Sequence, residues 1–324
     1  MSDLAISFII PNYNGAEVIG ECLRSVFAQS IPCDVIVVDD GSTDESRSRI
    51  GQLLRGHPRA RLLVHEKNKG FAAAVNTGIR AAETPYVLLF NNDATAAPAM
   101  AERMLKAIRR GKKLFSVSAC LLQADHPERI DDCGDHVSAF GRAFSPGRDR
   151  LREDYAKPRH IQSACAGAAL YDREALLSLG AFDEAFGSYL EDVDLGLRAQ
   201  RAGYRNVYEP SAVAYHKASH TSGSRYNAFK ARQTTANTLY MLYKNLPAWV
   251  LLLYLPLFTG GFLARGGFYT LKGLSGAYVS GLREGVSKIR QYNKNQYPSV
   301  KTAFRRDAML AIELLGNCFR HFTG

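Results

Sequence analysis

The segment Asn91-Asn92-Asp93 follows a run of apolar residues, 86–90, that is typical of a buried strand. Carboxylate and amide oxygens at the carboxyl end of a strand suit Mg²⁺ or Mn²⁺, which prefer oxygen ligands and commonly bridge to substrate phosphates. The same residue types also form ordinary turns. Taken alone, the segment therefore leaves a metal site and a turn as alternatives.

Three carboxylates stand close together in Glu191-Asp192-Val193-Asp194, at the start of a predicted charged helix over residues 191–202. The helix macrodipole favours acidic residues in a first turn, which accounts structurally for one or two of them. Crowding of carboxylates also raises the proton affinity of each, so that one of them can take the proton from a hydroxyl group as a general base.

His216 stands in Ala214-Tyr215-His216-Lys217 and precedes a small, polar run over residues 219–224. A single histidine after an apolar strand is commonly a hydrogen-bonded core residue, and it can also be a metal ligand. A glycine- and serine-rich segment beside a metal-binding histidine is what a lid that closes over substrate requires. We therefore expect residues 219–224 to act as a lid if His216 holds a metal.

An aromatic ring and carboxylates stand at two further predicted strand ends. The two segments are Pro11-Asn12-Tyr13-Asn14 and Asp39-Asp40-Gly41-Ser42. A uracil or thymine ring needs a surface for stacking and an acceptor for its N3–H group. Tyr13 and Asp40 could supply these two features. Asx turns between a strand and a helix are the alternative interpretation of both segments.

The elements that must position these residues follow a clear order in the first 120 residues. Short β-rich apolar runs alternate with longer helical patterns, which predicts βαβ units and a mostly parallel sheet. The predicted strands are 5–10, 34–39, 61–65 and 85–90, and the predicted helices are 17–29, 43–55 and 71–82, with Ser42 or Thr43 as the N-cap of the second. Ligands of such sheets bind beyond the carboxyl ends of the strands, so the segments at Pro11, Asp39 and Asn91 should converge.

The second part of the chain is less regular. The pattern predicts a strand over 115–121, a polar loop over 124–157, an apolar stretch over 164–171, helices over 173–179 and 191–202, and a helical block over 225–245. Residues 246–263 then carry no charge. They contain two prolines and two glycines and fall short of the roughly 20 residues of a membrane span. We expect an interfacial or re-entrant segment, with a buried core helix as the alternative.

The charge distribution supports contact with an anionic surface. The net charge is +10, and ten Lys or Arg stand against three Asp or Glu between Arg265 and the last residue. Basic residues beside an apolar segment suit the headgroups of an anionic cytoplasmic leaflet. No basic motif of a known nucleic-acid-binding fold is present, so we do not expect nucleic acid as a partner.

Length and composition exclude some classes of protein. With 324 residues and 46% hydrophobic content, the chain can bury a sizeable core, which excludes a mainly disordered or fibrous protein. The six cysteines include no Cys-x-x-Cys pair, so we do not expect a zinc site. The N-terminus shows no secretory signal, and we therefore expect reduced thiols and a catalytic part in the cytoplasm.

The ordered combination of these segments resembles the family-2 inverting glycosyltransferases of the GT-A fold, in particular bacterial rhamnosyltransferase-like members. The resemblance covers residues 5–245 and rests on segments that occur in the family's order. They are Ile9-Ile10-Pro11-Asn12-Tyr13-Asn14, Val37-Val38-Asp39-Asp40-Gly41-Ser42, Asn68-Lys69-Gly70-Phe71-Ala72-Ala73-Ala74-Val75-Asn76, Phe90-Asn91-Asn92-Asp93, Gly167-Ala168-Ala169 and Glu191-Asp192-Val193-Asp194, with His216 beyond.

The resemblance implies roles for individual residues. Asp192 matches the catalytic base, with Glu191 beside it. Asp93 matches the last residue of the family's Asp-x-Asp metal motif, and His216 matches a histidine that completes metal binding in some members. Asn91 stands where that motif has its first Asp, which implies a weaker hold on Mg²⁺ or Mn²⁺ and a greater dependence on the diphosphate. The residues implied for nucleotide binding are Pro11, Tyr13, Asp40, Gly70, Asn76 and Asn92.

The resemblance also implies a fold and a reaction. We expect a GT-A catalytic domain over residues 1–224, with a nucleotide-binding half at 1–113 and an acceptor half at 114–224, and a helical, membrane-associating extension over 225–324. The reaction would move a sugar, with rhamnose as the family-level choice, from a UDP or dTDP donor. The acceptor would be a saccharide or a polyprenyl-diphosphate-linked saccharide in bacterial cell-surface polysaccharide synthesis, at the inner face of the plasma membrane.

Three other classes of protein are the alternatives. A nucleotidylyltransferase would need a basic, glycine-rich loop after the first strand, and residues 11–15 contain no Lys or Arg. A dinucleotide-dependent oxidoreductase would need Gly-x-Gly-x-x-Gly at the same place, which is also absent. A catalytically inactive protein of the same fold that binds a membrane surface is the third possibility, and joint retention of Asp93, Asp192 and His216 argues against it.

Overall fold

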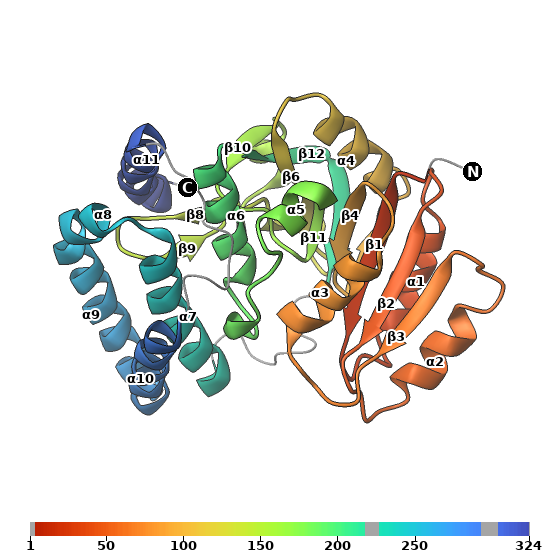
Figure 1. The fold of residues 1–324 in the computed structure, drawn as a ribbon, viewed down its shortest axis with the longest axis horizontal. Coiled ribbons are helices and arrows are strands. Elements are labelled where there is room, and N and C mark those ends of the chain that lie inside the picture. The colour runs from red at the N-terminus through yellow and green to blue at the C-terminus, as the bar shows by residue number, and fades with distance from the viewer. Residues whose placement is uncertain (1–3, 218–226, 293–303, 324) are drawn as a thin grey trace.

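The computed structural model describes residues 4–217, 227–292 and 304–323, and the predicted lid at 219–224 lies outside them. The first part of the chain alternates strands and helices as predicted (Figure 1). Its strands are β1 (Ile6–Asn12), β2 (Asp34–Asp39), β3 (Ala60–Val64) and β4 (Tyr86–Phe90), and its helices are α1 (Ile19–Phe27), α2 (Ser46–Leu53) and α3 (Phe71–Ala81). The predicted elements are confirmed here, with ends that differ by a few residues.

The predicted N-cap of α2 is wrong. The helix begins at Ser46, and Glu45 precedes it without a side-chain cap. Ser42 instead accepts a 2.9 Å hydrogen bond through Oγ from the backbone N–H of Asn14. Its own backbone N–H donates to Asp39 Oδ1 at 3.0 Å. The polar residues after β2 therefore tie the ends of β1 and β2 together instead of opening the next helix.

The second part contains more strands than the sequence pattern predicts. Its elements are β5 (Ala94–Ala96), α4 (Met100–Arg109), β6 (Leu114–Gln123), β7 (Ile130–Asp132), β8 (His136–Val137), β9 (Ala143–Phe144), η1 (Arg152–Tyr155), β10 (Arg159–Ile161), β11 (Ala168–Asp172), α5 (Arg173–Ser178), η2 (Glu184–Phe186), α6 (Glu191–Ala202) and β12 (Arg205–His216). The prediction of one polar loop over 124–157 is therefore wrong. Strands of two or three residues are too short to show a period, and their partners lie elsewhere in the chain.

One central sheet carries most of these strands, in the order β10-β12-β6-β11-β4-β1-β2-β3. The neighbours β4, β1, β2 and β3 are all parallel, as the βαβ pattern predicts. Strand β11 runs antiparallel to both β4 and β6, so the sheet as a whole is mixed. The parallel register aligns Asn12 at the end of β1 with Asp39 at the end of β2.

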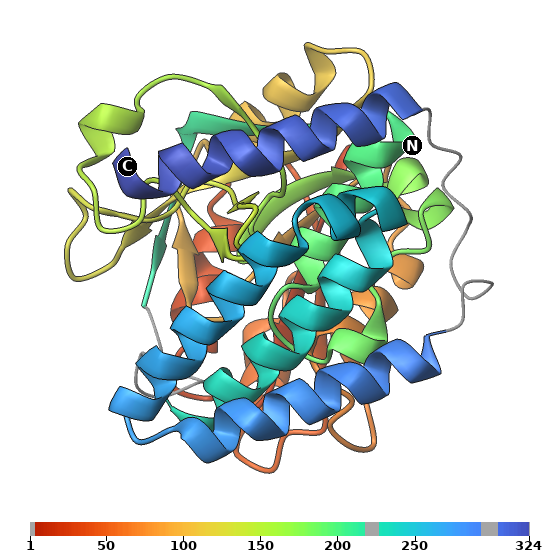
Figure 2. The same ribbon diagram turned by 90° about the vertical axis from the view of Figure 1, so that its left-hand side faces the viewer.

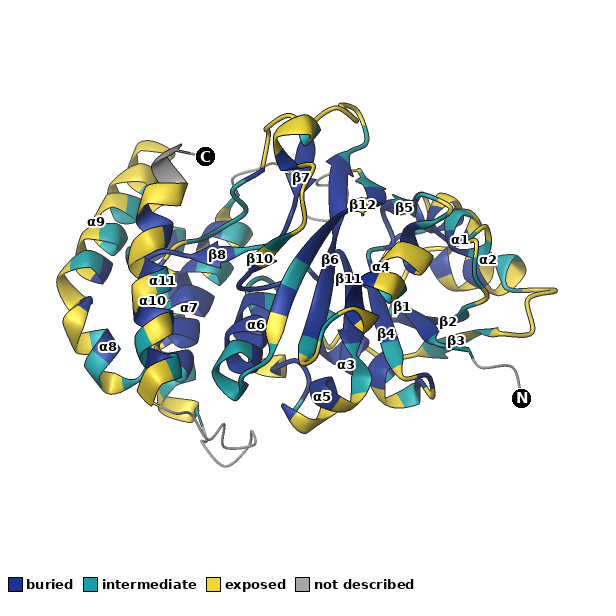
Figure 3. Ribbon diagram, turned by 90° about the horizontal axis from the view of Figure 1, so that it is seen from above, coloured by how far each residue is buried: buried dark blue, intermediate teal, exposed yellow. Residues whose placement is uncertain are grey.

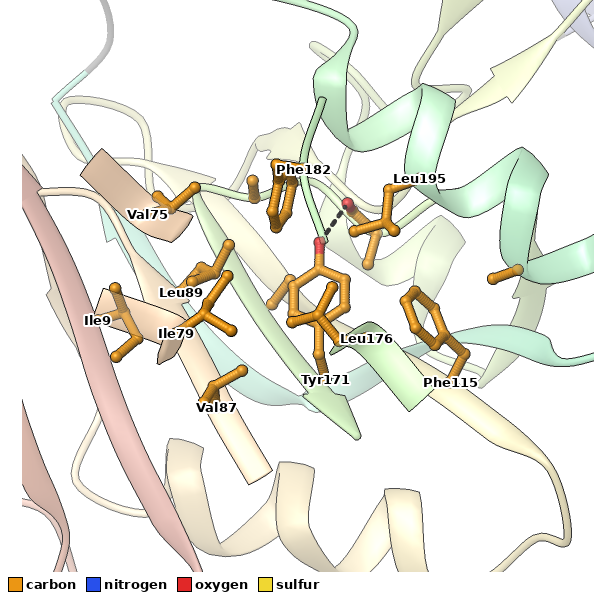
Figure 4. Close-up of a cluster of buried hydrophobic side chains, with 14 of the residues drawn as sticks. Ile9, Val75, Ile79, Val87, Leu89, Phe115, Tyr171, Leu176, Phe182 and Leu195 are labelled. Atoms are coloured by element: carbon orange, nitrogen blue, oxygen red, sulfur yellow. Dashed lines mark hydrogen bonds between the residues drawn. The ribbon is translucent and has the colours of Figure 1, made fainter. Parts of the chain in front are cut away.

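Apolar side chains cover both faces of this sheet, so its strands are fixed in position. One face packs against α3, α5 and α6 through a cluster that includes Ile9, Leu89, Tyr171 and Leu195 (Figure 4). The other face packs against α1 and α4, and there Phe8 and Phe90 meet edge to face at 5.8 Å. Burial of these side chains stabilises the strands whose ends carry the candidate site.

Helices form the last part of the chain and gather on one side of the molecule (Figure 2). They are α7 (Ala228–Asn245), α8 (Ala248–Leu253), α9 (Leu255–Leu271), α10 (Ser275–Gln291) and α11 (Phe304–Thr323). Their apolar side chains share a buried cluster with β8, η2 and α6, in which Phe186 and Leu197 meet Val250, Phe258 and Leu314. Residues 137–197 and residues 240–318 thus contribute to one buried cluster, and the predicted division into two domains stays a prediction.

The apolar stretch 246–263 forms α8 and the first part of α9, with Pro256 in the first turn of α9. Val250 and Phe258 are buried, which fits the core-helix alternative for one face of the stretch. Leu252, Leu255 and Leu263 are exposed. In Figure 3 much of the ribbon of α9 has the yellow of exposed residues. Among the described residues, no helix combines the length and apolarity needed to cross a bilayer.

Candidate active site

The carboxyl ends of β1, β2 and β4 meet, as the sequence predicts. Asn12 donates from Nδ2 to Asp39 Oδ2 at 3.0 Å, and its Oδ1 accepts from Asn92 Nδ2 at 2.8 Å. A chain of buried side-chain hydrogen bonds therefore joins the three strand ends. Because Asn92 uses its amide in this contact, it fixes the end of β4 against β1.

Asp40 lies at the centre of a second set of hydrogen bonds. Its Oδ1 accepts from the backbone N–H of Lys69 at 2.9 Å and lies 2.7 Å from His65 Nδ1. Its Oδ2 accepts from the backbone N–H of Gly70 at 2.8 Å. A carboxylate offers about four lone pairs, so Oδ2 can still accept one further hydrogen bond. Tyr13, at the neighbouring strand end, is 39% exposed and presents an aromatic surface.

Gly70 has a conformational reason to be glycine. Its φ is +93°, and a Cβ there would lie 3.3 Å from the carbonyl oxygen of Gly187. This close approach brings the loop before α3 against the turn that precedes α6. Pro11 lies inside β1, in register with Val38 of β2, and shapes the strand end from within the sheet.

Asp93 and His216 come together although they are far apart in the chain. His216 Nε2 lies 3.1 Å from Asp93 Oδ1, and Nδ1 lies 2.8 Å from Asp131 Oδ2. Burial alone would lower the pKa of His216, but its hydrogen bonds to the two carboxylates and their charges raise that pKa to about 10. The imidazolium form therefore donates to both aspartates.

Asn91 follows β4 and faces the segment before β11. Its backbone N–H donates to the carbonyl of Gly167 at 3.0 Å, and a Cβ on Gly167 would lie 3.2 Å from Asn91 Nδ2. Within the described part of the chain, no group of three or more His, Cys, Asp or Glu side chains is arranged to hold a metal ion. Asp93 and His216 are therefore at most a partial set of ligands.

Asp192 lies in the first turn of α6, next to the same segment before β11. Its Oδ2 accepts from the backbone N–H of Ala166 at 3.1 Å, and Oδ1 accepts from the backbone N–H of Val193 at 2.8 Å. Since Ala166 adjoins Gly167, which bonds to Asn91, the carboxylate of Asp192 stands beside the end of β4. Burial raises the pKa of Asp192, and its backbone hydrogen bonds oppose this effect.

Glu191 is buried, and its Oε2 makes no hydrogen bond with the described part of the chain. Burial, together with the charge of Asp192, raises the pKa of Glu191 well above its usual range. The third carboxylate of the cluster behaves differently. Asp194 is paired with Arg198 at 2.9 Å and with Lys244 at 3.0 Å, and these cations overcome burial and lower its pKa.

The expected origin of the raised pKa of Asp192 is therefore corrected. Crowding by Glu191 and Asp194 was the expected cause, whereas burial is the cause that the structure shows. Asp194 contributes to stability through ion pairs with cations from α6 and α7. The pair with Arg198 has the local spacing i, i+4, whereas the pair with Lys244 has no local sign in the sequence because Lys244 lies far along the chain.

Asn76 uses its side-chain amide inside the fold. Its Nδ2 donates to the carbonyl of Phe182 at 2.8 Å and to Glu184 Oε1 at 3.0 Å, and its Oδ1 accepts from the backbone N–H of Phe182 at 3.0 Å. Both N–H donors are thus occupied by the segment before α6. A direct contact of Asn76 with nucleotide stays a prediction, and the contacts observed give it a structural role.

Three carboxylates that the sequence analysis missed lie beside these residues. Asp131 bonds to His216 and to Arg148, whose Nη2 lies 3.2 Å from its Oδ1. Burial raises the pKa of Asp132 to about 7, and it raises that of Asp135 well above the usual range, with the charge of Asp192 adding to both shifts. The available signal was the pair Asp131-Asp132 in a segment interpreted as a loop.

The class of protein follows from this fold together with a family match. The mixed sheet, with polar side chains gathered at the ends of β1, β2 and β4, fits the GT-A fold that the sequence resemblance implies. Residues 7–180, more than half of the chain, match the family model described as glycosyl transferase family 2. The chain belongs to glycosyl transferase family 2.

Characterised relatives match over part of their length. The N-acetylglucosaminyl-diphospho-decaprenol L-rhamnosyltransferase of Mycobacterium tuberculosis is 28% identical over 216 residues, which cover 59% of this chain and 69% of that protein. The pre-mycofactocin glycosyltransferase of the same organism is 31% identical over 212 residues, and the match covers 65% of this chain and 42% of that protein.

Solved structures share the fold at low identity. Residues 1–349 of TarS from S. aureus, in complex with UDP-GlcNAc, give a TM-score of 0.61 at 17% identity, over 98% of this chain and 85% of that chain. The mannosyltransferase PcManGT from Pyrobaculum calidifontis, in complex with GDP-Man and Mn²⁺, gives 0.57 at 18% identity, over 97% of this chain and 79% of that chain. These likenesses establish the fold.

Proposed function

We propose that this glycosyltransferase is inverting and that Asp192 is its general base. Asp192 would take the proton of an acceptor hydroxyl while that oxygen attacks the anomeric carbon and the nucleoside diphosphate leaves from the opposite side. The single observation that carries this proposal is the contact of Asp192 with Ala166, beside the end of β4. A raised pKa favours a carboxylate that must accept a proton near neutral pH.

The donor in this proposal is a UDP- or dTDP-sugar. The ring of Tyr13 would stack on the base, and the remaining lone pair of Asp40 would accept its N3–H. Pro11, Gly70 and Asn92 would shape this pocket through the strand ends and the loop before α3. Rhamnose is the proposed sugar because the mycobacterial relative is named as an L-rhamnosyltransferase.

A divalent cation, Mg²⁺ or Mn²⁺, is the proposed cofactor. Asp93 Oδ1 and His216 Nε2 lie 3.1 Å apart, so a cation that replaced the proton between them would contact both, and Asn91 could add an amide oxygen. These residues fit a cation whose other ligands come from the diphosphate of the donor. When bound, the cation would neutralise the charge that builds up on the leaving diphosphate. The neutral form of His216 would be the ligand, because an imidazolium nitrogen has no free lone pair.

The acceptor in this proposal is a saccharide on a polyprenyl diphosphate, in the synthesis of a bacterial cell-surface polysaccharide. The name of the mycobacterial relative describes an acceptor of this kind. The exposed leucines of α8 and α9 and the basic residues that follow suit the cytoplasmic surface of an anionic bilayer. The enzyme would therefore work as a peripheral protein at the inner face of the plasma membrane.

The test uses purified full-length protein with Mg²⁺ or Mn²⁺ and a set of donors that includes dTDP-L-rhamnose, UDP-GlcNAc and UDP-glucose. Release of nucleoside diphosphate is followed with and without a lipid-linked N-acetylglucosamine acceptor. Asp192→Asn should lower turnover by about 10²-fold or more and leave UDP binding intact. The control is Glu174→Gln, which alters an exposed carboxylate in the first turn of α5 and should change neither quantity.

Two results would count against the proposal. Near-normal turnover of Asp192→Asn would remove Asp192 from the mechanism. If Glu191→Gln abolished turnover while Asp192→Asn retained it, the role of base would pass to Glu191.

A further inference from the structure

The turn that leads into α6 has an unusual backbone. Gly187, Tyr189 and Leu190 have φ values of +69°, +72° and +69°. Two of these three residues carry side chains that disfavour the left-handed region, so surrounding contacts must hold the turn in this shape. The turn ends directly before Glu191 and Asp192, and its conformation therefore sets the direction in which α6 begins.

Asn237 of α7 supplies those contacts. Its side chain is fully buried, and Nδ2 lies 3.0 Å from the carbonyl oxygen of Phe186, 2.9 Å from that of Ser188 and 2.8 Å from that of Tyr189. The two N–H groups of this amide thus share three carbonyl oxygens of the segment before α6, one of the N–H groups being shared between two of them. A residue far along the chain thereby holds the backbone on which the proposed base is carried.

Lys288 of α10 fixes which way this amide points. Its Nζ donates to Asn237 Oδ1 at 2.6 Å and lies 3.4 Å from Glu284 Oε1. An ammonium group can only donate, so it selects the orientation in which the amide oxygen faces α10 and the amide N–H groups face the turn. The side chain of Lys288 is largely buried, which keeps this contact away from solvent.

The other side of the turn contacts the predicted donor site. The backbone N–H of Ala72 donates to the carbonyl of Gly187 at 3.3 Å, and Gly70 approaches the same carbonyl closely. The N–H of Gly70 also binds Asp40, the proposed acceptor for the base of the nucleotide. The turn therefore lies between the loop that would hold the donor and the helix that carries Asp192.

We propose that Asn237, oriented by Lys288, is a positioning residue that sets Asp192 relative to the bound donor. This inference rests on the role proposed above for Asp192. Asn237 contacts neither carboxylate of Glu191-Asp192 by hydrogen bond, and it acts through the backbone of the turn. A small displacement of a reacting group is enough to lower turnover by about 10²-fold.

The experiment compares Asn237→Asp and Lys288→Met with wild type. Asn237→Asp keeps the size of the side chain and its contact with Lys288 but removes the donor to the three carbonyls. Lys288→Met leaves the amide in place but removes the group that orients it. Both variants should lower kcat by about 10- to 100-fold while KM for the donor and the affinity for UDP change less than twofold.

Two matched variants separate positioning from stability. Thr235→Val alters a fully buried hydroxyl on the same helix, which bonds only within α7, and should keep wild-type turnover. Lys288→Arg retains a cationic donor and should recover most of the turnover lost in Lys288→Met. All rates are measured well below the melting temperature of each variant and are expressed per folded molecule.

The outcomes are distinct. Wild-type kcat in Asn237→Asp, or an equal loss in Thr235→Val, would overturn the positioning role while leaving the proposed reaction in place. A wild-type chain that releases nucleoside diphosphate from none of dTDP-L-rhamnose, UDP-GlcNAc and UDP-glucose would overturn the proposed function, and this inference with it. Loss of kcat with unchanged UDP binding, recovered by Lys288→Arg, supports the assignment.

Discussion

Asp192 and Asp194 are the same residue type in one helical turn, and their surroundings give them opposite properties. Asp194 faces Arg198 and Lys244, so its carboxylate is held as an anion and its pKa falls. Within the described ranges, the carboxylate of Asp192 accepts from the backbone N–H groups of Ala166 and Val193 instead of from a cation, and burial raises its pKa. The carboxylate suited to accept a proton is thus distinguished by its environment rather than by the sequence around it.

The raised pKa of Asp192 predicts the acid side of the pH profile. A general base works only when deprotonated, so turnover should rise with pH as Asp192 loses its proton. Because burial shifts that event upward, the rise should lie above the range of an ordinary aspartate. The measurement is kcat against pH, with UDP binding followed over the same range to separate donor affinity from chemistry. Constant kcat down to pH 4 would contradict the assignment.

Contacts between the ends of neighbouring parallel strands could be predicted from the sequence, and contacts between distant segments could not. The convergence of Asn12, Asp39 and Asn92 was predictable, because parallel strands end at one edge of the sheet. The contact of His216 with Asp131 was not, because it joins the end of β12 to the short strand β7. Asn237 gave no signal, since its role depends on the backbone conformation of a distant turn.

At the scale of whole elements, the predicted ends agree with the structure where residues next to those ends mark them. Helix α6 has its predicted ends, since acidic residues stand at its start and Gly203, with a φ of +92°, closes it. Strand β2 also has its predicted ends, because its apolar run is bounded by turn residues. The two apolar helices α8 and α9 could not be separated by pattern, since both are uncharged up to Arg265.

The connection between α6 and α7 depends on a buried ion network. Lys244 Nζ lies 2.6 Å from Asp183 Oδ2 and 3.0 Å from Asp194 Oδ2, and all three side chains are almost fully buried. Tyr240 adds a hydrogen bond from its hydroxyl to Asp183 at 2.8 Å. This network joins the helix of the proposed base to the helix that carries Asn237. We therefore expect this network to contribute to stability as well as to the geometry of the site.

Lys244→Met should therefore destabilise the protein strongly. Removing one partner of a buried ion pair leaves buried charge without compensation and typically costs about 3–5 kcal/mol of the free energy of unfolding. The measurement is urea denaturation followed by tryptophan fluorescence and circular dichroism. Arg232→Met is the matched control on α7, because it breaks a partly exposed pair with Glu284 that should contribute about 1 kcal/mol or less. Equal midpoints for the two variants would show that the network is not stabilising.

At the scale of the whole molecule, the C-terminal helices have two faces of different character. The inner face is buried against β8, η2 and α6, where Leu246, Val250 and Tyr254 enter a shared cluster. On the outer face Leu252 and Leu263 are each 72% exposed. Helix α11 also exposes apolar side chains at helical spacing, namely Phe304, Ile312, Leu315 and Phe319. Figure 2 shows α9 and α11 on the same side of the molecule.

This outer face predicts binding to anionic vesicles through α8 and α9. Each leucine that becomes buried in the interface should contribute about 1.5–3 kcal/mol, and each nearby Lys or Arg about 1 kcal/mol. The combined variant Leu252→Ser, Leu263→Ser and Leu271→Ser should lower the partition coefficient by about 10²-fold or more. These positions are highly exposed, so the fold should be retained.

The measurement is co-sedimentation of full-length protein with vesicles that contain anionic lipid, compared with vesicles of neutral lipid only. Val64→Ser is the control, because it alters a 49% exposed side chain on β3, on the opposite side of the molecule from α9 (Figure 1). Wild type and Val64→Ser should sediment with anionic vesicles, less so at high salt, because salt screens the basic residues. If the triple variant sediments as wild type does, α8 and α9 do not form the membrane contact, and the proposed access to a lipid-linked acceptor must involve another face.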